Sequence, residues 1–265
     1  FDENPFFEAS SIRKIKGRYY FIYSPLPNTH NLCYAVSNYP DREFVYQGVL
    51  VSNADIFPNN PDRRIPLNYW GNNHGSILEL EDSYYIFYHR NTNKCSFARQ
   101  GCLERLEMTE DGRFLQSEIT SLGFAKEPRK AKGCHAAYTA CLLQKKDMPE
   151  FLPYTFYEYT DADPYFGEDE TVIPYVANLP EGAMTGFRYF DFDGTERTIT
   201  LTTRCHGVGE IEVICDGKSV GKVTLCEAAK WQKRQTTCSF SKGKAELRLV
   251  YHGNGAADVL YLEIE

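Results

Sequence analysis

The chain has 265 residues, enough for one large β domain or two smaller ones, and carries a formal net charge of −7. Its basic residues are spread out except in KEPRKAKG at 126–133, and nucleic-acid-binding proteins gather such residues on one face, so we expect no nucleic-acid partner. No apolar run approaches the ~20 residues of a membrane-spanning helix, so we expect no membrane partner either.

The nine cysteines are scattered, and no CxxC pair exists, so the spacing of a zinc finger is absent. In a β protein of this size such cysteines are typical of small buried apolar side chains in a reducing compartment, and a disulfide framework is the alternative. We therefore expect a cytoplasmic protein. Secretion stays open, because the chain opens in mid-pattern and its true N-terminus could lie upstream.

Two segments 65 residues apart share one pattern. SIRKIKGRYYFIYS at 11–24 and SILELEDSYYIFYH at 76–89 each contain an apolar strand, a tight polar turn and a strongly aromatic strand. This pattern is typical of a β-hairpin. Stretches with a turn followed by a strand come after both, at 39–52 and 109–121. The sequence therefore predicts a four-stranded unit that occurs twice.

Tandem four-stranded units indicate a β-propeller, and two unrelated hairpins are the alternative. Propellers typically close with four to eight blades, whereas residues 1–125 contain about two. We expect these residues to be the later blades of a larger propeller. The missing blades would precede Phe1 in the same protein or belong to a companion chain.

After Phe124 the pattern changes. We expect a linker at 126–133 and an antiparallel β-sandwich of jelly-roll type at 134–265, with no helix. The expected strands lie at 135–144, 154–159, 184–194, 197–207, 209–227, 234–243, 245–253 and 258–265. The predicted fold class is therefore all-β, a partial propeller followed by a sandwich.

Glu8 stands beside two phenylalanines, Phe6 and Phe7, just where the first β-pattern begins. Apolar surroundings disfavour the carboxylate and raise the pKa of a carboxyl group, which suits a general acid. A glutamate at a strand edge with its head in water is the alternative.

The register of the repeat aligns Glu8 with Asn73, and His74 follows at once. Both positions precede the first strand of their hairpins, and in a propeller that innermost strand lines the central channel. We therefore expect Glu8 and His74 to point toward one axial site. A histidine with a purely structural role is the alternative.

Three segments together resemble glycoside hydrolase family 43, five-bladed propellers that cleave arabinosides and xylosides. They are FFEASSIRKIKGRYYFIYS at 6–24, NNHGSILELEDSYYIFYHR at 72–90 and FARQGCLERLEMTEDGRFL at 97–115. The later stretch MTGFRYFDFDGTERTITLTTRCHGVGEIEVICDG at 184–217 resembles the family 6 carbohydrate-binding modules often attached to these enzymes.

The resemblance implies a role for three residues. Glu8 matches the general acid, Arg99 matches an arginine that contacts substrate, and His74 matches an axial histidine near or on a bound calcium or sodium ion. We also place His74 and Phe7 among the groups that bind substrate, and we expect no organic cofactor. An inverting glycosidase needs a second carboxyl group as its base. The resemblance puts that base and a further aspartate in the missing blades, so we expect the chain alone to be inactive.

These observations predict an inverting β-xylosidase or α-L-arabinofuranosidase that acts on oligosaccharides or on the side chains of plant polysaccharides such as xylan. The alternative is a carbohydrate-binding protein with a degenerate, non-catalytic propeller. An interaction scaffold is a weaker third option, because it gives the combination of Glu8, His74 and Arg99 no purpose.

The sandwich carries two aromatic residues that could stack on a sugar, Trp231 and Tyr165, and core packing is the alternative for both. Modules of this type often use an asparagine near the last strand. Here Asn254 lies upstream of that place and Tyr261 lies near it. A structural cap on the propeller is therefore a second interpretation of the sandwich.

Overall fold

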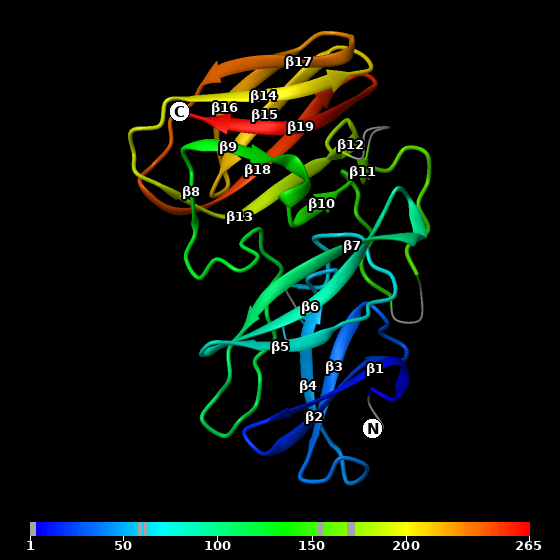
Figure 1. Ribbon diagram of the computed structural model, residues 1–265. Coiled ribbons are helices and arrows are strands. Elements are labelled where there is room, and N and C mark those ends of the chain that lie inside the picture. Colours follow the sequence, from blue (N-terminus) through cyan, green and yellow to red (C-terminus); the bar gives the residue numbers. More distant parts are fainter. Residues whose placement is uncertain (1–3, 58–59, 61–62, 153–155, 169–172) are drawn as a thin grey trace. The chain divides into compact units, whose positions relative to one another are not determined.

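The computed structural model describes residues 4–57, 60, 63–152, 156–168 and 173–265 (Figure 1). The chain divides into two compact units, one made of residues 1–91, 96–119 and 149–158 and the other of 92–95, 120–148 and 159–265. Strands dominate both units, and the described part of the second contains one helical turn, Ala137–Thr139, where we expected no helix. The prediction of an all-β chain is confirmed. No helix in the described ranges is long and apolar enough to cross a membrane.

The first unit begins with a four-stranded antiparallel sheet in the order β1-β2-β3-β4. Its strands are β1 (Phe6–Ile15), β2 (Arg18–Pro25), β3 (Asn31–Ser37) and β4 (Val45–Ser52). Lys16 and Gly17 connect β1 to β2, with φ angles of 46° and 84°. Positive φ at both central residues is the type I′ turn, whose twist matches that of the flanking strands.

The aromatic pattern of β2 forms the core of this sheet. Tyr20, Tyr34 and Phe114 contact one another, with ring centroids 5.5–6.3 Å apart. The Tyr34 hydroxyl accepts a hydrogen bond from the Phe114 amide at 2.7 Å. The segment around Phe114 is therefore fixed onto the first sheet.

A three-stranded sheet follows, in the order β5-β6-β7. Its strands are β5 (Ser76–Leu80), β6 (Ser83–Thr92) and β7 (Cys95–Leu106). Residues 109–121, where we expected a fourth strand, do not form one. That segment makes only isolated bridges, between Met108 and Phe114 and between Val51 and Ser117. One of its backbone hydrogen bonds goes to the first sheet, where the Ser117 amide donates to the carbonyl of Leu50.

The inner strands of the two sheets are neighbours. The Ser11 and Ser76 hydroxyl oxygens lie 2.7 Å apart, and Arg13 Nε donates to the carbonyl of Ile77 at 3.1 Å. Because Ser11 and Ser76 are equivalent positions of the repeat, β1 and β5 lie side by side as the first strands of adjacent propeller blades do.

The second unit consists of two sheets that form a sandwich (Figure 1). One sheet has the order β10-β13-β18-β15-β16 and the other β11-β12-β19-β14-β17, with β8 added beside β13 and β9 beside β19. The strands of the first are β8 (Arg129–Lys130), β10 (Leu142–Gln144), β13 (Met184–Phe192), β15 (Gly209–Cys215), β16 (Lys218–Leu225) and β18 (Gly243–Gly253). Those of the second are β9 (Gly133–Ala136), β11 (Tyr165–Glu168), β12 (Pro174–Pro180), β14 (Thr198–Cys205), β17 (Ala228–Thr237) and β19 (Ala256–Ile264).

Alternating side chains build the core of the sandwich, as in β14, where Ile199, Leu201, Thr203 and Cys205 are buried and their neighbours are half-buried. The observed strands differ from the predicted ones at several places. The strand expected at 135–144 is divided by a helical turn into β9 and β10, and β17 lies at Ala228–Thr237 instead of 234–243. Strands β11 and β12 were not expected. The strand expected at 154–159 lies partly outside the described residues, and 156–159 are not in a strand. Within the expected linker, β8 pairs with β13.

The cysteines, all of which lie in the described part of the chain, form no disulfide bond. Cys33, Cys141, Cys205, Cys215 and Cys238 are buried. Burial raises the pKa of the Cys33 thiol to about 12, so this side chain is an uncharged, apolar part of the core.

Candidate active site

Glu8 lies in an irregular part of β1. The pairing of β1 with β2 shifts register on both sides of Glu8, between Phe6 and Glu8 and between Glu8 and Ser11. Ala9 has a φ of 58°, a left-handed conformation that costs a residue with a Cβ roughly 1–2 kcal/mol. A β-bulge redirects the side chains of the strand that contains it. The bulge therefore sets the direction of the Glu8 side chain.

Glu8 and His74 are in direct contact. His74 Nε2 lies 2.9 Å from Glu8 Oε1, and the two side chains are 35% and 39% exposed. The pair forms one hydrogen bond, in which the donor is whichever group holds the proton. Two positions that the repeat places at the heads of neighbouring inner strands are thus brought together.

Phe6 and Phe7 do not enclose Glu8 in the part of the chain that the structure describes, so the expected apolar burial of Glu8 stays a prediction. Phe6 and Phe7 are 49% and 44% exposed, and the Phe6 ring packs against Phe21 and Tyr23. Side chains of successive residues in a strand point to opposite faces, so neighbours in sequence do not enclose a carboxyl group by themselves. The Glu8 carboxyl is instead half-open to solvent and held by His74. The exposed Phe7 ring stays a predicted contact for substrate.

His89 of β6 extends this contact toward Arg99. Its ring packs edge-on against that of His74, with centroids 5.4 Å apart, and its Nε2 lies 3.3 Å from Arg99 Nη1. Burial, together with the charges of Arg99 and His74, lowers the pKa of His89 to about 4. A neutral His89 therefore accepts a hydrogen bond from the exposed Arg99 guanidinium.

His89 is not among the site residues predicted from the sequence. The alignment of the two repeats could have indicated it. Ser24 and His89 occupy equivalent positions, and a histidine that replaces a serine in one copy alone is a candidate for a role in the site. The structure brings together three of the four residues predicted in this unit, Glu8, His74 and Arg99, through His89, and Phe7 is not part of this series of contacts.

The buried side chain of Asn73 holds the backbone around the histidines. Asn73 Nδ2 donates to the carbonyl of His30 at 3.1 Å, and Asn73 Oδ1 accepts from the His89 amide at 3.4 Å. Gly75 is required here, because a Cβ at that position would lie 1.8 Å from the carbonyl oxygen of Phe87. The segment that carries His74 is therefore closely packed against β6.

The calcium or sodium ion expected near His74 stays a prediction. Calcium takes six to eight oxygen ligands. Among the described residues, no group of three or more histidine, cysteine, aspartate and glutamate side chains is arranged to hold an ion. His74 and Glu8 alone supply one imidazole and one carboxylate, so no chemical step is assigned to an ion.

In the sandwich, Trp231 of β17 packs against other side chains of the same unit. The Arg204 guanidinium lies over its ring at 4.2 Å from the centroid, and Tyr175 meets it edge-on at 5.3 Å. Asp258 Oδ2 accepts from Arg204 Nε and Nη2 at 3.0 and 2.8 Å. A face covered by Arg204 is not open to stack on a sugar, so the contacts favour the packing alternative for Trp231.

The other residues considered in the sandwich also make internal contacts. Tyr165, like Trp231 and Tyr261, packs against a cluster formed by Tyr175 and its buried neighbours. Asn254 Oδ1 accepts from the Val208 amide at 2.8 Å, which ties two loops together. A sugar site at these positions stays a prediction.

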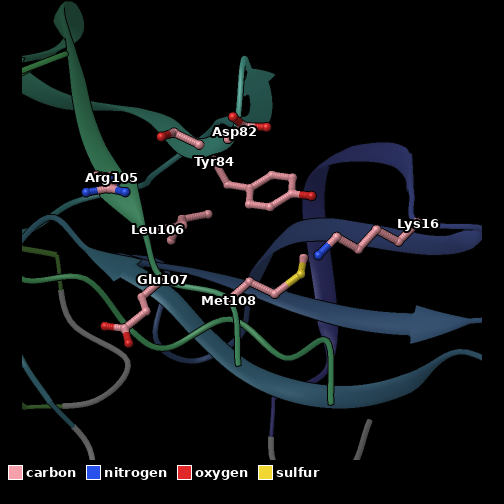
Figure 2. A pocket seen from close by; sticks show the side chains of 8 residues that line it. Lys16, Asp82, Tyr84, Arg105, Leu106, Glu107 and Met108 are labelled. Atoms are coloured by element: carbon pink, nitrogen blue, oxygen red, sulfur yellow. The ribbon is translucent and has the colours of Figure 1, made fainter. Parts of the chain in front are cut away.

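A polar cavity of about 570 Å³ lies at the other end of the hairpins of the first unit. Figure 2 shows its side chains arriving from the β1–β2 turn (Lys16), the β5–β6 turn (Asp82) and the end of β7 (Arg105–Met108). Lys16 follows the last residue of β1 and Glu8 lies near the first, about 25 Å apart along an extended strand. This cavity is therefore separate from the cluster around Glu8.

No family model matches the chain, but known proteins do. It is 39% identical over 266 residues to a xylosidase/arabinosidase of Thermoclostridium stercorarium, covering 98% of this chain and 56% of that protein. It is 23% identical over 288 residues to an arabinoxylan arabinofuranohydrolase of Paenibacillus polymyxa, covering 97% and 40%. The crystal structure of a glycoside hydrolase family 43 arabinoxylan arabinofuranohydrolase from Bacillus subtilis, in complex with cellotetraose, matches with a TM-score of 0.51 and 19% identity, covering 98% of this chain and 54% of that one.

The chain is thus homologous to a xylosidase/arabinosidase and spans about half of that relative's length. The similarity runs through both units, since almost the whole chain is matched. The match to the solved structure shows that the fold is shared.

Proposed function

We propose that the chain is part of an inverting glycosidase of family 43 that cleaves β-xylosides or α-L-arabinofuranosides, with Glu8 as its general acid. The observation that carries this proposal is the 2.9 Å contact between Glu8 and His74. It joins the carboxyl group of Glu8, in β1, to the imidazole of His74, two residues before β5, and a five-bladed propeller has its axial site at the heads of such inner strands.

In this mechanism Glu8 donates its proton to the oxygen of the leaving group as the glycosidic bond breaks. His74 is a positioning residue, because its hydrogen bond fixes the direction of the Glu8 carboxyl group. Arg99 offers fixed donors to the hydroxyl groups of the sugar. His89, neutral above pH 4, holds the guanidinium without adding a second positive charge.

The second half of the reaction requires a base that activates water on the opposite face of the sugar. In inverting enzymes the two carboxyl groups lie roughly 6.5–9.5 Å apart. We propose that the base, and a second aspartate that acts on Glu8, come from propeller blades outside this sequence, in the same protein or in a companion chain. An oligosaccharide would then bind between the two parts.

The experiment that tests this proposal measures hydrolysis of aryl β-D-xyloside and aryl α-L-arabinofuranoside. It compares this chain alone, the longer protein that contains it, and the longer protein with Glu8→Gln. We expect activity only in the longer protein, lowered about 10²–10⁴-fold by Glu8→Gln, as removal of a general acid does. Glu110→Gln, a change of an exposed glutamate in the same unit, is the control.

A non-catalytic carbohydrate-binding protein is the second candidate. The half-open Glu8 carboxyl group is compatible with this alternative. Binding of xylan oligosaccharides by the longer protein, with no hydrolysis and with no effect of Glu8→Gln, would favour this function over the enzyme.

A further inference from the structure

A second cavity, of about 410 Å³, opens at the connection between β2 and β3. Its lining includes the polar residues Asn28, His30 and Asn31 and the apolar residues Ile56, Phe151 and Leu152. This volume lies within the range of pockets that bind small molecules. It is distinct from the contact between Glu8 and His74.

Three polar atoms in the wall of this cavity are buried without a hydrogen-bond partner in the structure: Asn28 Oδ1, His30 Nε2 and Asn31 Oδ1. The His30 and Asn31 side chains belong to residues that are only 2% and 1% exposed. A buried polar group without a partner costs about 1–3 kcal/mol, so three such atoms around one cavity favour the binding of a polar molecule there.

Contacts with neighbouring residues hold Phe151, in the apolar part of the lining, in place. The Phe151 ring lies 4.2 Å from His30 and 5.6 Å from Trp70, measured between ring centroids. The Phe151 amide also donates to the carbonyl of Arg64 at 3.2 Å. Contacts within the first unit therefore fix the position of Phe151 in the lining.

Its charges favour a neutral occupant. Arg64 and Glu150, the charged residues of its wall, pair with each other at 3.8 Å and are 68% and 60% exposed, which places them at the mouth. Burial lowers the pKa of His30 to about 3, so the imidazole is neutral. Two amide oxygens repel an anion, and without an inner carboxylate they suit a divalent cation poorly.

We propose that this cavity binds one neutral sugar ring, whose hydroxyl groups bond to Asn28, His30 and Asn31 and whose apolar face packs on Phe151 and Leu152. This inference deepens the proposed function, since it names a second place where a saccharide of the same class is held. The cavity connects to the candidate active site through Asn73, which precedes His74 and donates to the carbonyl of His30.

Calorimetric titration of this chain with methyl β-D-xyloside and with methyl α-L-arabinofuranoside tests the proposal. We expect saturable binding of at least one glycoside, with a dissociation constant on the order of millimolar, as one ring can supply. Titration followed by NMR should shift the imidazole nitrogen signals of His30. Leu152→Trp, at a residue 61% exposed at the mouth, should weaken binding about tenfold or more. Leu80→Trp, at a residue 45% exposed elsewhere in the unit, is the matched control and should leave binding unchanged.

The proposal is overturned if neither glycoside binds, if binding leaves the His30 signals unmoved, or if a crystal soaked with the glycosides shows only ordered water in the cavity. It is also overturned if Ca²⁺ alone moves the His30 signals in the same way. Binding is measured on this chain without hydrolysis. A failure of the proposed enzymatic function would therefore leave the result intact, and loss of binding would not touch the role of Glu8.

Discussion

Ser11 and Ser76, equivalent residues of the two repeats and 65 positions apart in the chain, join their hydroxyl oxygens at 2.7 Å. Their strands are the innermost of two sheets, and the contact places the two repeats edge to edge. The same register brings Glu8 against His74, three and two residues before the serines. The relation between the repeats therefore determines the geometry of the candidate active site.

The first prediction concerns this contact. Ser11→Ala and Ser76→Ala should each destabilise the first unit by about 1 kcal/mol, and the double variant should lose less than the sum, with a coupling of about 0.5–1 kcal/mol. Urea unfolding followed by Trp70 fluorescence measures it. Trp231→Phe as background removes the signal of the second unit, because the chain has two tryptophans. A coupling of zero would mean that the serines do not bond in solution.

The second prediction concerns the bulge beside Glu8. Ala9 has a φ of 58°, where glycine meets no steric penalty. Ala9→Gly should therefore stabilise the first unit by about 0.5–1 kcal/mol, the relief of strain exceeding the added entropy of the unfolded chain. The control is Ala98→Gly, in the interior of β7, which should destabilise by about 0.5–1 kcal/mol. Equal effects of the two changes in the same Trp70 assay would contradict a strained bulge.

The third prediction is a loss of stability in acid. The pKa of His30 is lowered by burial to about 3 from an ordinary 6.5, so between these values the unfolded chain binds a proton that the folded chain refuses. The contribution of His30 is complete above pH 6.5 and falls by about 3 kcal/mol as the pH drops from 6.5 to 4. Free energies of unfolding measured by urea titration across this range provide the test. In His30→Phe the slope should be shallower, and an unchanged slope would show that His30 is not buried as a neutral group.

The fourth prediction concerns the sandwich. Asp258 accepts two hydrogen bonds from Arg204 and one from the Asn178 amide, and its side chain is 7% exposed. Asp258→Ala leaves the Arg204 charge without its partner over Trp231, and should cost about 3 kcal/mol. Trp231 fluorescence, in a Trp70→Phe background, reports the unfolding. Glu263→Ala breaks the more exposed pair with Lys233 and should change stability by less than about 1 kcal/mol. Similar losses for both would contradict a structural role for the Arg204 cluster.

The sequence predicts the hairpins well because their signals are local. The segment 11–24 contains the turn residues and the aromatic strand that form β1 and β2, and 76–89 does the same for β5 and β6. Strand β12 was missed because it begins and ends with proline and contains Asn178 at a φ of 57°, features that interrupt a strand pattern.

For the candidate site, the register of the repeat predicts which residues lie close together, and it predicts nothing else. Register places Glu8 and His74 at equivalent ends of neighbouring strands, but it carries no information on what covers them. Burial of Glu8 by Phe6 and Phe7 was inferred from adjacency in sequence, and the observed exposure shows that enclosure depends on contacts across the fold. The stacking of Arg204 on Trp231 was invisible for the same reason, since these residues meet only across β14 and β17.

The central claim is that Glu8 protonates the leaving group. The most direct test compares the loss of kcat caused by Glu8→Gln on substrates with poor and with good leaving groups. In the longer protein, Glu8→Gln should lower kcat by about 10²–10⁴-fold for a xyloside or arabinofuranoside with a poor leaving group such as phenol. The loss should be far smaller for the 2,4-dinitrophenyl glycoside, whose leaving group departs without a proton. Equal losses on both substrates would contradict the assignment of Glu8 as the general acid.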